Sequence, residues 1–304
     1  MSNNILKLIA GLCFAATFSS AQSLPSKWED LTSADFVKAI QKADGVCILP
    51  MGSLEKFGPS APVGTNLYLA RVVAEQATKK EYAVIYPSYF VAETSNTSNL
   101  PGTIHYSLKM QMDFLTETVN EMARNGCKKI ILANGHSSNT GLINLFIADL
   151  ADTPHNYAVY SIYPTGFPVA GPTLNQLPPA AQPSARGVDG HGGEERVAAM
   201  LAYYPDLIHL DRAHDEPTSV GHGVEGTAAA PRNPLPQGAM REIPTGYSGD
   251  AAGATAVRGQ ALMNWGIDKL VQFIEAVKAD NETVKVEAEF YEKFEHPENP
   301  KPAK

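Results

Sequence analysis

Cysteine is scarce in this sequence: the 304 residues include three, and no two of them form a Cys-x-x-Cys pair. That spacing is typical of dithiol redox sites and of thiolate zinc sites, so the sequence supports neither. Cys47 and Cys127 each lie among apolar, strand-like residues. The sequence leaves open whether they are small buried thiols or, in an exported protein, an oxidised pair.

Clusters of Lys and Arg are also lacking. The chain has 24 Lys and Arg residues against 32 Asp and Glu residues, and its net charge is -8. We therefore expect neither nucleic acid nor an anionic membrane as a partner. There is no internal repeat, and 44% of the residues are hydrophobic. This composition suits one compact globular domain with a large core.

The chain has no apolar run long enough to span a membrane. Its N-terminal run, Leu8 to Phe18, follows Lys7 and precedes the small residues Ser19 and Ala21. This pattern predicts a secretory signal peptide over residues 1–21, and hence a periplasmic or secreted protein. Leu12 stands before Cys13 where a lipoprotein signal has a small residue, so we do not expect a lipid anchor.

Strand-like and helix-like segments alternate along most of the chain. Strands are predicted at 46–50, 83–90, 128–134 and 157–163, and helices at 34–44, 67–80, 107–126, 137–152 and 255–279. This rhythm is typical of βαβ units, so we expect an α/β fold with a largely parallel sheet. Residues 22–280 are predicted to form a single domain, and 281–304 a charged C-terminal tail. Two long segments without periodicity, 164–190 and 217–254, are where substrate specificity is expected.

Chemically active side chains follow two of the predicted strands. Glu55 comes after the run "ILPMGSL", and His136 after "IILANG". Ligands of open parallel sheets bind where strands end, so we expect these residues to share a site. A third group lies in "DGHGGEERV": if a helix begins near His191, then His191, Glu194 and Glu195 lie on one of its faces.

Five motifs in this order resemble those of the creatininase (creatinine amidohydrolase) family, over about residues 30–278. They are "PMGSLEKFGPSAPVGTN", Pro101-Gly102-Thr103, "LANGHSSN", "HGGEE" with the later "YPDLI", and "GYSGDAAGAT". The resemblance implies a three-layer α/β/α fold and assembly as a homo-oligomer. It also implies hydrolysis of cyclic or linear amide bonds with two divalent metals.

The metal ligands of the family are only partly kept. The resemblance assigns the first metal to Glu55, Asn66 and His136, with Asn66 in place of a bridging Asp. It assigns the second to Phe57, Asn66 and Ser138, of which Phe57 cannot coordinate an ion. A neutral Asn66 cannot bridge two cations, so a two-metal mechanism is not expected. At most one divalent ion, Zn or Mn, is expected on Glu55, Asn66 and His136, and no organic cofactor.

Two further positions depart from the family pattern. Its second His of the first motif is Ser60 here, and the acidic residue expected two positions after Glu194 is Arg196. We interpret His191 as the residue that moves a proton, with Glu194 orienting it or acting in its place. Phe57, Ser138 and Asn139 are the expected substrate contacts.

Several functions fit this pattern. The first is a hydrolase of a small amide or lactam; the second is a catalytically degenerate protein that keeps the pocket to bind a small ligand. A serine hydrolase is disfavoured because "GHSSNTG" has Asn139 where the nucleophile elbow needs Gly. The "HGGEE" cluster lacks the second His of a metalloprotease helix, so we expect it to be catalytic rather than metal-binding.

Overall fold

The computed structural model describes residues 24–167, 175–184, 189–218 and 245–298, so the predicted signal segment lies outside the described residues. The helices are α1 Ser33–Lys42, α2 Thr65–Thr78, α3 Leu108–Arg124, α4 Asn139–Leu150, α5 Glu194–Tyr203, α7 Ala256–Ala279 and α8 Thr283–Glu295. The strands are β1 Val46–Met51, β2 Val84–Ile85, β3 Lys129–Asn134 and β4 Ala158–Ile162. Short 3₁₀ turns connect several of these elements.

The four strands form one parallel sheet in the order β2-β1-β3-β4. The chain leaves β1 for β2 on one side and returns to β3 on the other, so the strand order reverses at the β1–β3 pair. Met51 and Asn134, the last residues of these strands, are register partners. The turns that follow them therefore begin side by side, at the point where open α/β sheets bind ligands. The predicted α/β fold with a parallel sheet is confirmed.

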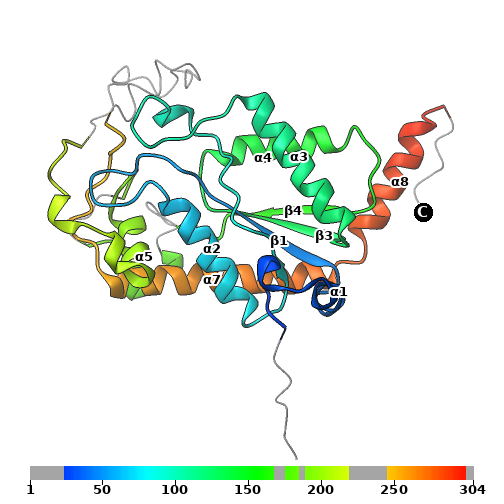
Figure 1. Ribbon diagram of the computed structural model, residues 1–304, viewed down its shortest axis with the longest axis horizontal. Coiled ribbons are helices and arrows are strands. Elements are labelled where there is room, and N and C mark those ends of the chain that lie inside the picture. The colour runs from blue at the N-terminus through cyan, green and yellow to red at the C-terminus, as the bar shows by residue number, and fades with distance from the viewer. Residues whose placement is uncertain (1–23, 168–174, 185–188, 219–244, 299–304) are drawn as a thin grey trace, which may run out of the picture.

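Alternate residues of the central strands face two separate cores, which makes the sheet the middle of three layers. Val46, Ile48 and Ile131 pack against α2, α5 and α7. Cys47, Leu49, Met51, Ile130 and Leu132 pack against α1, α3 and α4. Figure 1 shows α3 and α4 on one side of the sheet and α2 and α7 on the other. Strands buried on both faces are continuously apolar, as parallel strands are.

Some predicted boundaries were wrong. The strand expected over 83–90 is reduced to Val84–Ile85, because Pro87 has no N–H to continue the ladder. Only an isolated bridge between Met51 and Tyr89 follows it. α1 begins one residue earlier than predicted, at Ser33, and the Thr32 hydroxyl caps it by accepting from the backbone N–H of Asp35. α2 begins two residues earlier than predicted, so Thr65 and Asn66 lie inside its first turn and Gly64 precedes it.

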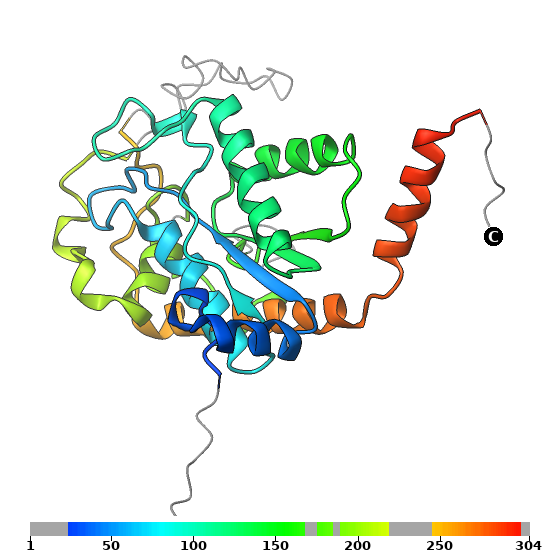
Figure 2. The same ribbon diagram turned by 45° about the vertical axis from the view of Figure 1, so that its right-hand side comes forward.

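The charged tail contains a helix. α8 follows α7 at the β4 side of the molecule, Figure 2 shows it apart from α3 and α4, and Tyr291 is its buried residue. The Tyr291 hydroxyl contacts His155 Nδ1 at 2.9 Å. Within the ranges described, no helix combines the length and the apolar character that crossing a bilayer requires.

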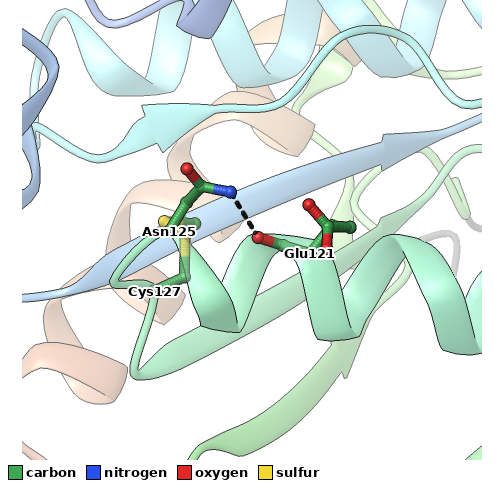
Figure 3. Close-up of a disulfide and its surroundings, with 4 residues drawn as sticks. Glu121, Asn125 and Cys127 are labelled. Atoms are coloured by element: carbon green, nitrogen blue, oxygen red, sulfur yellow. Dashed lines mark hydrogen bonds between the residues drawn. A yellow bond between two sulfur atoms is a disulfide. The ribbon is translucent and has the colours of Figure 1, made fainter. Parts of the chain in front are cut away.

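Cys47 and Cys127 form a disulfide, which settles the pairing that the sequence left open. Both are fully buried, and the bond ties the turn between α3 and β3 to strand β1 (Figure 3). In the same turn, Asn125 Nδ2 donates to the carbonyl of Glu121 at 2.8 Å. The cross-link encloses a sequence separation of 80 residues, so it removes many conformations from the unfolded chain.

We expect the disulfide to contribute about 2–5 kcal/mol to the free energy of unfolding. Urea unfolding of the wild type with and without a reductant measures this contribution. The matched control is the double variant Cys47→Ala/Cys127→Ala, whose unfolding midpoint should not respond to the reductant. An unchanged wild-type midpoint after complete reduction would contradict the expectation.

Candidate active site

Two glycines allow the turns after β1 and β3 to close against the start of α2. A Cβ on Gly52 would lie 2.3 Å from the Cα of Leu67, and a Cβ on Gly135 would lie 2.7 Å from the Cβ of Ala70. Any side chain at either position would push the turns away from the helix. Because neither glycine carries a side chain, Glu55, the first turn of α2 and His136 come close together.

Glu55, Asn66 and His136 form one buried hydrogen-bonded cluster. The Glu55 carboxylate is 2% exposed, and its Oε1 lies 3.0 Å from Nδ1 of His136. Asn66 Nδ2 donates to the same Oε1 at 2.9 Å and lies 3.2 Å from Nδ1 of His136. Ser53 and Thr97 donate their hydroxyls to the carboxylate, at 2.9 and 3.2 Å. The structure thus brings together the three residues predicted to bind metal.

The electrostatics of this cluster are those of a buried ion pair. His136 Nε2 lies 2.7 Å from the carbonyl of Glu93, which can only accept, so this nitrogen carries a proton. Burial lowers the pKa of His136, but the adjacent Glu55 outweighs it and the pKa is raised. Burial raises the pKa of Glu55, but His136 and the hydroxyl donors outweigh it and hold the pKa well below its usual range. A charged form of both residues is therefore favoured.

The donor set does not fit two metal ions. Asn66 turns its amide N–H groups, not its carbonyl, toward Glu55; the reverse orientation would place two acceptors in contact. Phe57 presents an aromatic ring in place of the expected His. Among the described residues, no three His, Cys, Asp or Glu side chains gather into a metal site. Glu55 Oε1 and His136 Nδ1 remain as two donors of the right kind, which suits one divalent ion at most.

A cavity of about 350 Å³ opens beside this cluster. Side chains from the β1 and β3 turns, the segment after β4 and the start of α5 contribute to its wall. The lining residues are Phe57, Asn66, His136, Ser137, Tyr163, Gly166, Phe167, Asp189, Gly190, His191, Glu195 and Arg196. Imidazole, carboxylate, guanidinium and hydroxyl groups therefore face one small space, as in sites that bind polar small molecules.

His191 lies in the cavity wall, as predicted, but not on the helix. α5 begins at Glu194, so the helical spacing proposed for His191, Glu194 and Glu195 does not apply to His191. Its Nε2 donates to the carbonyl of Lys56 at 2.7 Å, which leaves the lone pair on Nδ1. The ring packs against Phe57, with centroids 4.5 Å apart. An imidazole held in this way has one nitrogen able to take a proton.

Glu194 and Glu195 point to different surroundings. Glu194 is fully buried, pairs with Arg258 at 2.8 Å and accepts from the Ser184 hydroxyl at 2.6 Å. It is absent from the cavity wall, in which Glu195 stands instead. Glu195 Oε1 pairs with Arg196 Nε at 3.0 Å. Burial raises the pKa of Glu195 to about 7, although Arg196 partly opposes it.

Only one of the three predicted substrate contacts lies in the cavity wall. Phe57 lines the cavity, but Ser138 and Asn139 are not among the lining residues. Ser138 precedes α4, and the buried Asn139 accepts from the backbone N–H of Glu93 at 2.9 Å. Ser137 stands in the wall in their place.

Sequence reasoning missed Ser137, Tyr163 and Glu195 as members of the cavity wall. Tyr163 accepts from Arg196 Nη2 at 2.7 Å. It follows β4, which ends at the same edge of the parallel sheet as β1 and β3, and that position was a usable signal. Glu195 could have been chosen over Glu194 only with the start of α5 known.

Comparison with known proteins gives one family. The creatininase (creatinine amidohydrolase) sequence profile matches residues 29–274. The creatinine amidohydrolase of Pseudomonas putida is 29% identical over 200 residues, which are 62% of this chain and 75% of that protein. A mycofactocin precursor peptide peptidase of Mycobacterium ulcerans is 20% identical over 266 residues, 84% of this chain and 88% of that protein.

Solved structures show the same fold. The crystal structure of a creatinine amidohydrolase (creatininase) matches with a TM-score of 0.68 and 22% identity, over 85% of this chain and all of that one. Creatininase structures described as Mn and Zn–Zn forms match with a TM-score of 0.66.

The raised pKa of Glu195 predicts a pH-dependent stability. Between its ordinary value of 4.5 and about 7, the folded chain keeps a proton that the unfolded chain has lost. Stability should therefore fall as pH rises through this window, by up to about 3 kcal/mol, and level off above it. Urea unfolding of wild type and Glu195→Gln at pH 5 and pH 8 isolates this contribution. An equal pH dependence in both proteins would contradict it.

Proposed function

Because the chain belongs to the creatininase family, we propose that it is a hydrolase that cleaves the C–N bond of a small amide or lactam. The observation that carries the proposal is the cavity in which His191 and His136 stand together at the carboxyl edge of β1 and β3. Two relatives support this chemistry by their names, an amidohydrolase and a peptidase. A third, a 3-dehydro-scyllo-inosose hydrolase of Thermotoga maritima, supports hydrolysis but not the C–N bond.

His191 is the proposed base. Its Nδ1 takes a proton from the attacking water, while the bond from Nε2 to the Lys56 carbonyl fixes the ring. The same nitrogen then returns the proton to the leaving amine. Glu194 has no contact with His191 among the bonds and ion pairs of the described residues, and its bonds to Arg258 and Ser184 favour a role in positioning the start of α5.

Glu55 and His136 are the residues that would hold one divalent ion. Such an ion would polarise the amide carbonyl and lower the pKa of a bound water. Solved structures of the same fold are described as Mn and Zn–Zn forms, which supports a divalent ion in a protein of this fold. The replacement of the second-site ligands by Phe57 and Ser138 supports a count of one at most.

One observation favours the second candidate, a small-ligand binding protein that has lost the chemistry. Glu55 Oε1 already accepts from Asn66 Nδ2 and pairs with His136 Nδ1, so the two atoms suited to a metal ion are engaged within the chain. In that case Phe57, packed on His191, provides an aromatic surface for the ligand.

We also propose that the protein is exported and forms a homo-oligomer. The disulfide supports export, because such bonds persist in oxidising compartments such as the periplasm. The pattern of residues 1–21 supports a cleaved signal, and N-terminal sequencing of the natural protein, expected to begin near Gln22, tests it. Oligomerisation is supported by the family resemblance alone, and light scattering of the purified protein tests it.

The hydrolase proposal predicts turnover of small amides that depends on His191. We expect the wild type to release amine from one or more of a panel of lactams and linear amides, followed by NMR. His191→Ala should lower kcat about 100-fold or more, because the proton acceptor is gone. The matched control is His105→Ala, since His105 is exposed and lies outside the cavity wall. If the wild type binds but does not cleave these amides, the binding-protein reading replaces this one.

The residues that replace the metal ligands of the family predict how many ions the protein holds. Elemental analysis of the dialysed wild type should find no more than one divalent ion per chain. In the triple variant Phe57→His/Asn66→Asp/Ser138→Glu, a bridging carboxylate and two ligands return, and a second ion should be held. Two tightly held ions in the wild type would refute the count. A triple variant that binds no additional ion would show that these turns do not share the geometry of the family.

A further inference from the structure

Two polar atoms on side chains of the cavity wall have no hydrogen-bond partner among the described residues, and they are of opposite kind. Oε2 of Glu195 is an acceptor, and Nη1 of Arg196 is a donor. The two side chains are 10% and 7% exposed, and both residues line the cavity. Buried polar atoms without partners are costly and uncommon in folded proteins. A bound group that supplies both missing partners would remove that cost.

The other atoms of both groups are fixed, so the two free atoms keep their places. Glu195 Oε1 and Arg196 Nε are 3.0 Å apart, and Arg196 Nη2 donates to the Tyr163 hydroxyl at 2.7 Å. Oε2 and Nη1 belong to the same planar groups as the atoms of the 3.0 Å contact. They therefore lie within the span of one small ligand.

Charge pairing around the cavity favours a neutral ligand. Ion pairs stand in or beside its wall: Glu55 with His136 at 3.0 Å, Glu195 with Arg196 at 3.0 Å, and Arg258 with both Asp189 and Glu194 at 2.8 Å. Each charged side chain of the wall thus has an oppositely charged partner. A ligand with a net charge would bring in one buried charge without compensation, which is costly. A neutral group with one acceptor and one donor meets both free atoms.

We propose that Glu195 and Arg196 recognise the amide group of the ligand itself. Arg196 Nη1 donates to the carbonyl oxygen, and Glu195 Oε2 accepts from the amide N–H. As a statement about substrates this rests on the proposed function, and it narrows the class to lactams and other amides that carry a free N–H. Amides with two substituents on nitrogen, and esters, are excluded because they leave the Glu195 oxygen unpaired.

A matched pair of lactams tests this recognition: 2-pyrrolidinone, which has an N–H, and N-methyl-2-pyrrolidinone, which has none. Binding is measured by calorimetry or NMR titration at pH 8, where the Glu195 carboxylate is ionised. We expect the wild type to bind the N–H lactam at least tenfold more tightly than its methylated partner. This comparison needs no variant.

Glu195→Gln sharpens the test. Arg196 Nε requires an acceptor, so Gln would give it the amide oxygen and turn its NH₂ group to the ligand. We expect the variant to lose the tenfold preference, since the acceptor for the N–H is gone. The matched control is Glu75→Gln, which alters a Glu–Arg pair with Arg71 outside the cavity wall and should keep the preference.

Three results would overturn the proposal: equal affinity of the wild type for both lactams, binding of neither, or an unchanged preference in a folded Glu195→Gln variant. The same experiments distinguish a failure of the hydrolase proposal from a failure of the recognition proposal. Preference for the N–H lactam without turnover of any amide leaves the recognition standing and removes the hydrolase. Equal turnover of N–H and N-methyl amides leaves the hydrolase standing and removes the recognition.

Discussion

The Glu55 carboxylate is 2% exposed, and a buried charge of this kind must be hydrogen-bonded and paired. Its partners come from four segments of the chain: Ser53 beside it, Asn66 on α2, Thr97 on a 3₁₀ turn and His136 after β3. Displacement of any one of these segments would leave the carboxylate short of a partner. The need to satisfy one acid therefore fixes how the loops around the cavity meet.

The need to satisfy the buried Glu55 carboxylate also explains why the departures from the family pattern are consistent with one another. An Asp at position 66 would place a second anion against Glu55, and only cations could then stabilise the pair. Asn66 supplies N–H donors instead, and His136 supplies the positive charge. Arg196 adds a fixed positive charge. Its interaction with Glu55 is attractive and favours the charged form of the Arg196 guanidinium. Asn66, His136 and Arg196 thus stabilise the negative charge of Glu55 from within the chain.

The sequence predicted the fold and the shared site of Glu55 and His136, because both residues follow apolar strands that end in glycine turns. The place of Asn66 came from the family resemblance. The register of β1 and β3 then brings the turns together without further information. The disulfide could not be predicted, since it depends on how closely the turn before β3 approaches β1. The shortening of β2 at Pro87 was readable in principle from the missing N–H.

The choice between Glu194 and Glu195 depended on where α5 begins. One residue along a helix turns the side chain by about 100°, so neighbouring acids face different surroundings. Asp189 Oδ1 accepts from the backbone N–H of Glu195 at 2.9 Å, and the same carboxylate holds Arg258 of α7. The contact between α5 and α7 thereby sets the first turn of α5. Glu194 is turned toward Arg258, and Glu195 toward the cavity. A tertiary ion pair, which has no local signal in "DGHGGEERV", therefore decides which carboxylate the ligand meets.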